Sequence, residues 1–213
     1  MKGQNLNRQK QLDALLPALE GTPRLLLQSC CGPCSSYVLE YLSRYFRVTV
    51  LFYNPNIRPR AEYDKRLAYQ KLLIAALPTE HPVTMLETEY DGAAYTRAVT
   101  GLEGEPEGGA RCPVCYRLRL ERTAQLAAEL GYDWFCSTLS VSPHKDAQLL
   151  NTLGEELAAR YGVRWLPSDF KKRGGYLRSI ELSRIYGLYR QDYCGCGLPE
   201  HPEWAETEAE HDE

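Results

Sequence analysis

Apolar and polar residues alternate along the chain in a way that predicts a sheet built from alternating strands and helices. Short apolar runs occur at 24–29, 48–53 and 133–138, with weaker ones at 82–86 and 163–166. Runs of this kind are typical of strands covered on both faces. Helical periodicity connects them at 8–20, 35–45, 59–76, 91–99, 112–130, 143–161 and 176–189. The pattern predicts one α/β domain, with a mostly parallel sheet and helices on both faces.

Seven of the eight cysteines fall into three clusters, which are Cys30, Cys31 and Cys34, then Cys112 and Cys115, then Cys194 and Cys196. The first cluster follows a predicted strand and precedes a helix. Ligands of open α/β sheets bind at such turns, and a helix N-terminus favours thiolate over thiol. These cysteines are therefore placed to react or to hold metal. The eighth, Cys136, lies within a predicted strand and is expected to be a buried structural residue.

The second cluster follows a segment of Gly, Glu and Pro at 101–109, which is expected to be a mobile loop without packing contacts. Pro113 suits the first position of a helix, so Cys112 is predicted to cap that helix. Cys115 would then lie one turn further on the same face, with both sulfurs pointing the same way.

The chain has 213 residues, enough to bury a core without disulfides or a metal to hold it. It has no apolar run approaching the ~20 residues that span a bilayer, and its first ten residues are polar, without the pattern of a leader segment. We therefore expect a cytoplasmic protein that uses no membrane partner. In that reducing compartment, clustered cysteines indicate metal binding or catalysis.

Charge is unevenly distributed. The net charge is −3, but residues 200–213 hold seven acids and no Lys or Arg, leaving 25 bases against 21 acids in residues 1–199. We expect the domain to span 1–199 and the acidic tail, 200–213, to be frayed. Residues 164–190 contain seven bases and two acids. This basic region is either a phosphate-binding surface or a set of solvated helix faces.

The cysteine pattern leaves three kinds of chemistry open. Cys31–Cys34 matches the Cys-Gly-Pro-Cys motif of thioredoxin, but thioredoxin chemistry leaves the other clusters unexplained. Two Cys-x-x-Cys pairs could hold a structural zinc without redox activity, which leaves Cys30, Cys194 and Cys196 without a role. An iron–sulfur cluster held by several loops, with a second thiol pair beside it, uses all seven clustered cysteines.

Taken together, the motifs resemble those of the cobalamin-independent epoxyqueuosine reductases of the QueH family. The resemblance covers most of residues 24–197. It rests on eight segments that occur in order, namely Cys30–Cys34, Tyr53–Ile57, Tyr63–Arg66, Cys112–Leu120, Ser137–Pro143, Phe170–Gly175, Ser183–Tyr186 and Tyr189–Cys196.

The resemblance implies the last step of queuosine synthesis, in which the epoxide of epoxyqueuosine at the wobble position of tRNA is reduced to an alkene. It also implies a Rossmann-like fold of the nucleotide-α-hydrolase (HUP) kind and a 4Fe-4S cluster. Carried over by position, the expected cluster ligands are Cys30, Cys31, Cys112 and Cys115. Cys194 and Cys196 correspond to a redox-active pair that serves catalysis, although such a close pair could also chelate metal.

The family also implies an additional iron beside the cluster. Some members carry Asp at the position of Cys34, which makes Cys34 the candidate ligand for that iron. Candidate proton donors for the departing oxygen are Tyr53, His144 and Asp146.

A tRNA partner strengthens the phosphate-binding interpretation of the basic region. Tyrosine can stack on bases and Lys or Arg can pair with phosphates. The resulting candidates for tRNA binding are Lys171, Lys172, Arg173, Tyr176 and Arg190, with Tyr186, Tyr189 and Tyr193 as further stacking candidates. The reaction also requires an electron donor, whose identity the sequence does not give.

Overall fold

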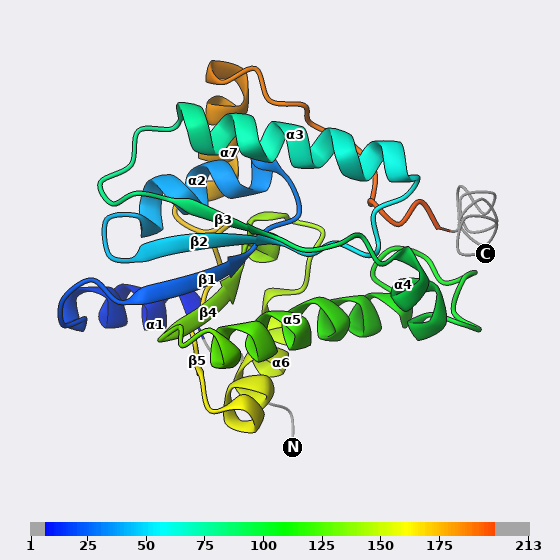
Figure 1. The fold of residues 1–213 in the computed structure, drawn as a ribbon, viewed down its shortest axis with the longest axis horizontal. Coiled ribbons are helices and arrows are strands. Elements are labelled where there is room, and N and C mark those ends of the chain that lie inside the picture. The colour runs from blue at the N-terminus through cyan, green and yellow to red at the C-terminus, as the bar shows by residue number, and fades with distance from the viewer. Residues whose placement is uncertain (1–6, 199–213) are drawn as a thin grey trace.

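The protein, described here from a computed structural model over residues 7–198, is built on one five-stranded parallel sheet (Figure 1). The strand order is β3-β2-β1-β4-β5, and every neighbouring pair is parallel. The strands are β1 (Arg24–Gln28), β2 (Arg47–Phe52), β3 (Thr84–Glu87), β4 (Trp134–Ser137) and β5 (Arg164–Trp165). This is the single-domain, Rossmann-like α/β arrangement that the apolar pattern and the family resemblance predict.

Helices cover both faces of the sheet (Figure 1). Helices α2 (Gly32–Leu42), α3 (Arg60–Ala76) and α7 (Gly175–Ile185) lie on one side, and α5 (Arg111–Glu129) and α6 (Ala147–Tyr161) lie on the other. The remaining helical elements are α1 (Arg8–Leu15), η1 (Leu16–Ala18), α4 (Gly92–Ala98) and η2 (Thr138–Val141). No helix within residues 7–198 is both long enough and apolar enough to cross a membrane.

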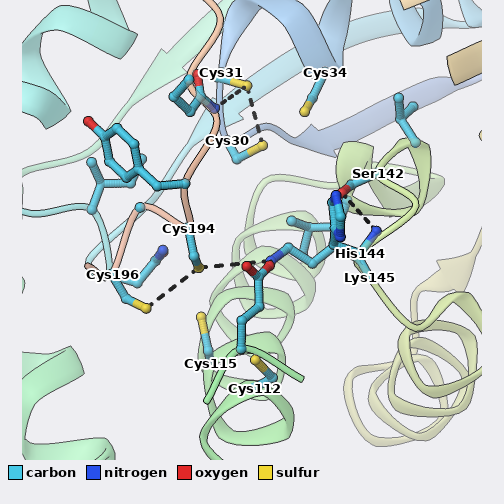
Figure 2. Close-up of a pocket in the computed structure, with 18 of the residues that line it drawn as sticks. Cys30, Cys31, Cys34, Cys112, Cys115, Ser142, His144, Lys145, Cys194 and Cys196 are labelled. Atoms are coloured by element: carbon cyan, nitrogen blue, oxygen red, sulfur yellow. Dashed lines mark hydrogen bonds and ion pairs between the residues drawn. The ribbon is translucent and has the colours of Figure 1, made fainter. Parts of the chain in front are cut away.

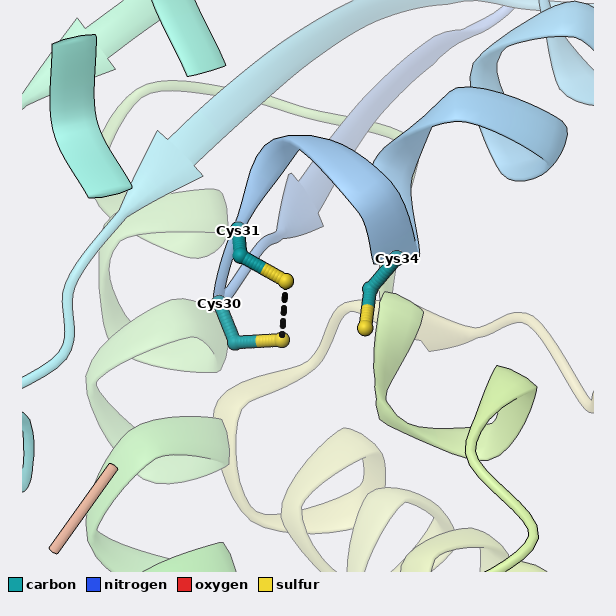
Figure 3. A group of neighbouring side chains, drawn as sticks. All are labelled: Cys30, Cys31 and Cys34. Carbon is teal, nitrogen blue, oxygen red and sulfur yellow. Dashed lines mark hydrogen bonds between the residues drawn. The ribbon is translucent and has the colours of Figure 1, made fainter. Parts of the chain in front are cut away.

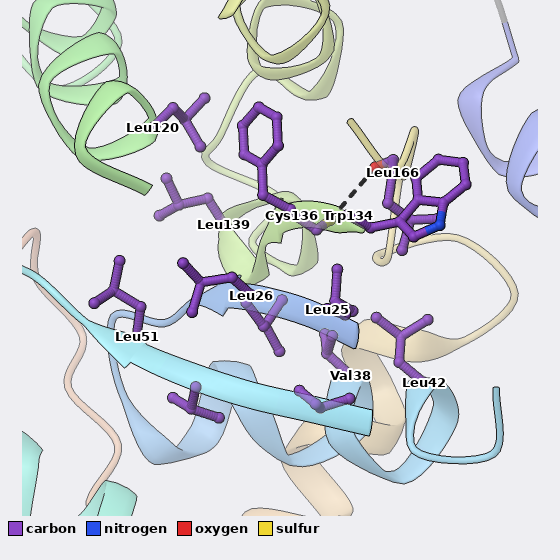
Figure 4. Close-up of a cluster of buried hydrophobic side chains, with 14 of the residues drawn as sticks. Leu25, Leu26, Val38, Leu42, Leu51, Leu120, Trp134, Cys136, Leu139 and Leu166 are labelled. Carbon is purple, nitrogen blue, oxygen red and sulfur yellow. Dashed lines mark hydrogen bonds between the residues drawn. The ribbon is translucent and has the colours of Figure 1, made fainter. Parts of the chain in front are cut away.

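The apolar core lies between the sheet and these helices (Figure 4). Leu25, Leu26 and Leu51 are fully buried strand residues, each contributing about 1.5–3 kcal/mol through its burial. Cys136 is fully buried among them, and its Sγ lies 3.4 Å from the Leu166 carbonyl oxygen. Burial raises the pKa of Cys136 to about 12. The prediction that this cysteine is a buried structural residue is confirmed.

The sheet has a topological switch point between β1 and β4. The chain leaves β1 toward β2 on one side and reaches β4 on the other, so the loops after β1 and β4 diverge and open a crevice. The loop after β1 carries Cys30, and the one after β4 begins η2. Cys30 Sγ lies 4.0 Å from Thr138 Oγ1 across this crevice. The fold therefore places the first cysteine cluster at its ligand-binding edge.

Several predicted helix boundaries are wrong for identifiable reasons. Helix α2 begins at Gly32 rather than at residue 35, with Cys31 as its N-cap, so Cys34 lies inside the first turn. Helix α6 begins at Ala147 rather than 143 because the Asp146 carboxylate caps it, accepting from the N–H groups of Gln148 and Leu149. Helix α7 ends at Ile185 rather than 189. The predicted 8–20 helix divides into α1 and η1.

The start of α5 also differs from the prediction. Ala110 is the N-cap, so Cys112 lies inside the first turn and does not cap the helix. The Glu105 carboxylate accepts a hydrogen bond from the Ala110 N–H at 3.0 Å, which starts the helix earlier than Pro113 suggests. The acidic tail, predicted to be frayed, lies outside the described residues.

Candidate active site

The first cysteine loop (residues 30–34) gathers three thiols on the turn between β1 and α2 (Figure 3). The sulfurs of Cys30, Cys31 and Cys34 all lie within 4.8 Å of one another, and those of Cys30 and Cys31 are 3.7 Å apart. Three soft ligands at this spacing could bind one metal ion.

The shape of this loop is fixed by α3, which packs directly against it. The Gln70 side-chain oxygen accepts hydrogen bonds from the Ser29 and Ser35 hydroxyls, each at 2.7 Å. A Cβ on Gly32 would lie 2.9 Å from the Tyr69 carbonyl oxygen, so only glycine allows the start of α2 to approach α3 this closely. The loop is therefore held by hydrogen bonds on one side and by backbone contact on the other.

The middle pair, Cys112 and Cys115, lies in the first turn of α5, and both residues are buried. Cys112 Sγ accepts a hydrogen bond from the Gly108 N–H at 3.2 Å. The 101–109 segment thus packs against the site, and its Glu107 carboxylate forms an ion pair with Lys145. The expectation that this segment makes no packing contacts is wrong, because Glu107 pairs with the partly buried Lys145 and Arg111 donates to the Glu103 carbonyl oxygen, contacts that the sequence did not indicate.

The last cysteine loop (residues 194–196) has no regular secondary structure and is held by distant parts of the chain. Its two sulfurs are 3.5 Å apart, with the Cys196 thiol donating to Cys194. The Lys145 Nζ lies 3.8 Å from Cys194 Sγ. Nearby, the Gln191 side-chain amide donates to Cys31 Sγ at 3.4 Å, which joins this segment to the first cysteine loop.

All three groups of thiols face one cavity of about 500 Å³ (Figure 2). The structure therefore brings together, from three separate segments of the chain, every cysteine that the sequence assigns to metal or redox chemistry. Cys136, the cysteine assigned to the core, does not line this cavity. Cys34 lies with Cys30 and Cys31, as their spacing in the sequence predicts.

Four buried or partly buried cations also line the cavity, and the sequence analysis gave none of them a role. They are Arg66, Arg111, Arg119 and Lys145. Arg119 Nη2 donates to the Asn54 side-chain oxygen at 2.7 Å, which links two motifs of the family resemblance. The three arginines could have been found from the sequence, because each lies on the buried face of an amphipathic helix, α3 or α5.

These cations and the sulfurs themselves divide each thiol group into unequal members. Hydrogen bonds from Cys31 and Cys34, helped by the charges of Arg119 and Arg66, hold the pKa of Cys30 well below its usual range. Hydrogen bonds with Cys30 and Cys31 raise the pKa of Cys34. In the last loop, a hydrogen bond from Cys196 and the Lys145 charge lower the pKa of Cys194. The thiolate form is therefore favoured at Cys30 and Cys194.

The predicted tRNA contacts fall in two places. Tyr176 and Arg190 line the cavity, with the Arg190 guanidinium carbon 5.8 Å from the centre of the Tyr176 ring. Lys171, Lys172 and Arg173 do not line it. Lys171 pairs with Asp169 at 2.8 Å and Arg173 pairs with Asp13, whereas Lys172 is exposed.

Other bases of the region are ion-paired as well. Arg178 pairs with Glu40 and Glu181, and Arg164 lies 3.7 Å from Asp133. These carboxylates come from α1, α2, α7 and the turn before β4, so the sequence analysis, which counted charges only within 164–190, did not include most of them. Much of the excess positive charge of this region is therefore neutralised within the chain.

The predicted proton donors are also separated. His144 lines the cavity and is exposed. Asp146 caps α6 with its carboxylate, and Tyr53 belongs to the apolar core rather than to the cavity lining. Of the three, only His144 is positioned to reach a molecule bound there.

The donor set fits a metal cofactor. The cavity is lined by soft sulfur ligands from three loops, and buried guanidinium and ammonium groups can balance the charge of several thiolates. Cys30, Cys31 and Cys34 already lie at mutual distances that one metal could bridge.

Comparison with known proteins gives a consistent result. The sequence model of "Epoxyqueuosine reductase QueH" matches residues 25–201. A protein of that name from Streptococcus pyogenes serotype M1 is 47% identical over 176 residues, covering 82% of this chain and 69% of the relative. The Staphylococcus epidermidis protein is 43% identical over 203 residues, covering 92% and 85%, and the Haemophilus influenzae protein is 34% identical, covering 88% and 76%. The chain belongs to the epoxyqueuosine reductase QueH family.

Proposed function

We propose that this protein reduces epoxyqueuosine in tRNA to queuosine, as the last step of queuosine synthesis. The observation that supports this most strongly is the convergence of seven thiols from three loops on one cavity of about 500 Å³. Family membership indicates the substrate, and the thiols that line the cavity would provide the groups that reduce it. A tRNA substrate and reduced, metal-binding thiols both favour the cytoplasm as the site of action.

Cys30, Cys31, Cys112 and Cys115 would hold a 4Fe-4S cluster, with Cys34 available to an adjacent iron. Support comes from the shared cavity and from Arg111 and Arg119, whose positive charges can balance thiolate ligands. When bound, such a cluster supplies electrons one at a time. The grouping of Cys34 with Cys30 and Cys31 is compatible with one metal bridging the three or with two metals side by side.

Cys194 and Cys196 would form the catalytic thiol pair. Conversion of an epoxide to an alkene and water requires two electrons and two protons, which is what two thiols release when they form a disulfide. Their sulfurs are 3.5 Å apart, and the lowered pKa of Cys194 makes it the more nucleophilic of the two. Lys145, in contact with Cys194 Sγ, would hold the thiolate and can supply a proton to the departing oxygen. An external electron donor must then reduce the disulfide.

The substrate nucleotide has to leave the anticodon stack to reach these thiols. Tyr176 and Arg190 line the cavity and would contact the extruded nucleotide by stacking and phosphate pairing. Lys172 is exposed and would contact the flanking backbone, while Lys171 and Arg173 would first have to exchange their ion pairs for phosphates.

The test is anaerobic purification followed by metal analysis and an activity assay. We expect about four to five iron atoms and about four acid-labile sulfides per chain, with broad brown absorbance. Epoxyqueuosine tRNA incubated with the reduced protein should yield queuosine, detected by nuclease digestion and mass spectrometry. About one zinc per chain, no labile sulfide and no conversion would instead support a zinc-stabilised tRNA-binding domain.

A further inference from the structure

The Tyr63–Arg66 motif of α3 carries part of the family resemblance, yet the proposed function gives it no task. Two of its charged residues, Asp64 and Arg66, differ in their surroundings. Asp64 pairs with Arg60 at the surface, where the two side chains are 52% and 61% exposed. Arg66 is 4% exposed and pairs with Glu62, with Nε 2.6 Å from Oε1. A buried ion pair of this kind holds the guanidinium in one orientation.

The Arg66 guanidinium lies against the last cysteine loop. A Cβ on Gly195 would lie 2.9 Å from Arg66 Nη1, so the peptide between Cys194 and Cys196 passes directly against it. Its positive charge also acts on Cys30 and Cys31 of the first loop. Arg66 also lines the cavity into which both loops turn their sulfurs.

One nitrogen of this guanidinium is left over. Within residues 7–198, Arg66 Nη2 is buried and has no hydrogen-bond partner. Leaving a buried charged donor unpaired is costly, and a ligand that supplies an acceptor atom would recover that cost. Two other cations of the cavity are occupied, since Lys145 contacts Glu107 and Cys194 and Arg111 donates to the carbonyl oxygens of Glu103 and Leu198. Arg119 donates from Nη2 to Asn54, and its Nε is also buried without a partner among residues 7–198.

We propose that Arg66 is a catalytic residue whose Nη2 donates a hydrogen bond to the epoxide oxygen of the substrate. This rests on the proposed function. Both carbon–oxygen bonds of the epoxide break, a carbon–carbon double bond forms, and the Cys194 and Cys196 thiols are oxidised to a disulfide. The oxygen leaves as water with one proton from the Cys196 thiol and one from the Lys145 ammonium, which holds the Cys194 thiolate. Negative charge builds on the oxygen during this step, and a guanidinium that keeps its own protons stabilises that charge.

Three variants and one pair of ligands test this. Arg66→Lys keeps a charge beside Glu62 but loses the fork of donors. Glu62→Gln with Arg66→Gln removes both partners, so no unpaired buried charge is left to unfold the protein. Arg60→Met is the matched control, because it removes an exposed ion pair from the same helix. The ligands are tRNA carrying epoxyqueuosine and the same tRNA carrying queuosine, which lacks the oxygen.

We expect both Arg66 variants to lower kcat by about 100- to 1000-fold, the effect of losing an oxyanion donor. Binding of epoxyqueuosine tRNA should weaken by about tenfold, whereas queuosine tRNA should bind as it does to wild type. Thermal unfolding and iron content should not change in either variant, and the midpoint potential of the cluster should not change in Arg66→Lys, which keeps the charge. The Arg60 variant should match wild type throughout.

Two results would overturn the proposal. Equal weakening of both tRNAs would mean that Arg66 only supports the shape of the cavity. A shifted midpoint potential, with epoxide affinity unchanged, would mean that Nη2 serves the cluster. A wild-type chain that converts no epoxide would refute the proposed function separately, because the comparison of the two tRNAs in binding needs no turnover.

Discussion

The first and last cysteine loops end in the same cavity but are built by different means. The first loop is local, because a strand, a helix start and hydrogen bonds to Gln70 fix it. The last loop has no regular structure, and its Gly195 carbonyl accepts from the Arg58 N–H at 2.8 Å. The comparison shows that a cysteine motif can be rigid through its own backbone or only through its neighbours. We expect the first kind to suit metal binding and the second to suit redox turnover.

The largest effects are expected when one cysteine in each loop is replaced by serine. Cys194→Ser should lower epoxide reduction by about 10³-fold or more while iron content stays unchanged, because a catalytic nucleophile is lost and no cluster ligand is. Cys31→Ser should lose iron and sulfide. Iron content and turnover measured on both variants check this. Loss of the brown absorbance in the Cys194 variant would show that the last loop also binds metal.

A smaller effect is expected from adding one methyl group to each loop. Gly32→Ala places a Cβ against the backbone of α3, which cannot yield, and should cost about 1–3 kcal/mol in urea unfolding. Gly195→Ala meets side-chain atoms of Arg66 and Ile57 rather than backbone, so it should cost less stability than Gly32→Ala while turnover falls by about 10- to 100-fold.

Gly104→Ala is the control for both, since no atom lies within 4 Å of its added Cβ. It should stay within about 0.5 kcal/mol of wild type. A Gly32 variant as stable as this control would contradict the close approach of α2 to α3.

The pH dependence of thiol alkylation tests the reactivity of Cys194 in the last cysteine loop. Because the pKa of Cys194 is lowered, its thiolate persists as pH falls below the usual thiol value of about 8.5, so iodoacetamide should still react with it near pH 7. Lys145→Met should raise that pKa and slow alkylation near pH 7 several-fold. The rate is read from the mass of the peptide that contains Cys194. An unchanged pH profile in this variant would remove Lys145 from the control of the thiolate.

The smallest expected effect concerns the approach of tRNA to the last loop. Arg190→Ala and Lys172→Ala should each reduce the slope of log affinity against log salt by about one if each residue contacts one phosphate. Arg160 is an exposed residue of α6 that pairs with Glu121 of α5, and Arg160→Ala should leave the slope unchanged. Slopes identical in all three variants would place the RNA elsewhere on the surface.

The sequence was sufficient to predict the strands, their parallel arrangement and the seven clustered cysteines, because runs of apolar residues and short cysteine spacings are local signals. It placed the helix starts less well. Asp146 and Glu105 begin α6 and α5 at positions that Pro143 and Pro113 did not indicate, since a capping side chain is recognised only when its backbone partner is known.

The parts of the site that the sequence did not predict all depend on contacts between distant segments. Lys145 became a site residue through Glu107 and Cys194, which lie 38 and 49 residues away. Arg66 did so through Gly195. In the basic region, Arg173 and Arg178 are paired with Asp13 and Glu40, which a local count of charge omits. Charge composition can therefore indicate a surface but not which of its charges are available.

The hydrogen bond between Gln191 and Cys31 has a consequence for folding. It joins residues 160 apart in the chain, whereas the first cysteine loop closes within one turn of backbone. Contacts of such high sequence separation carry a large loop-closure entropy and form after the local ones. Both Cys30–Cys31 and Cys112–Cys115 are synthesised before the segment that covers them. These four thiols therefore stay open to solvent during synthesis until the segment that contains Gln191 has been made and has folded over them.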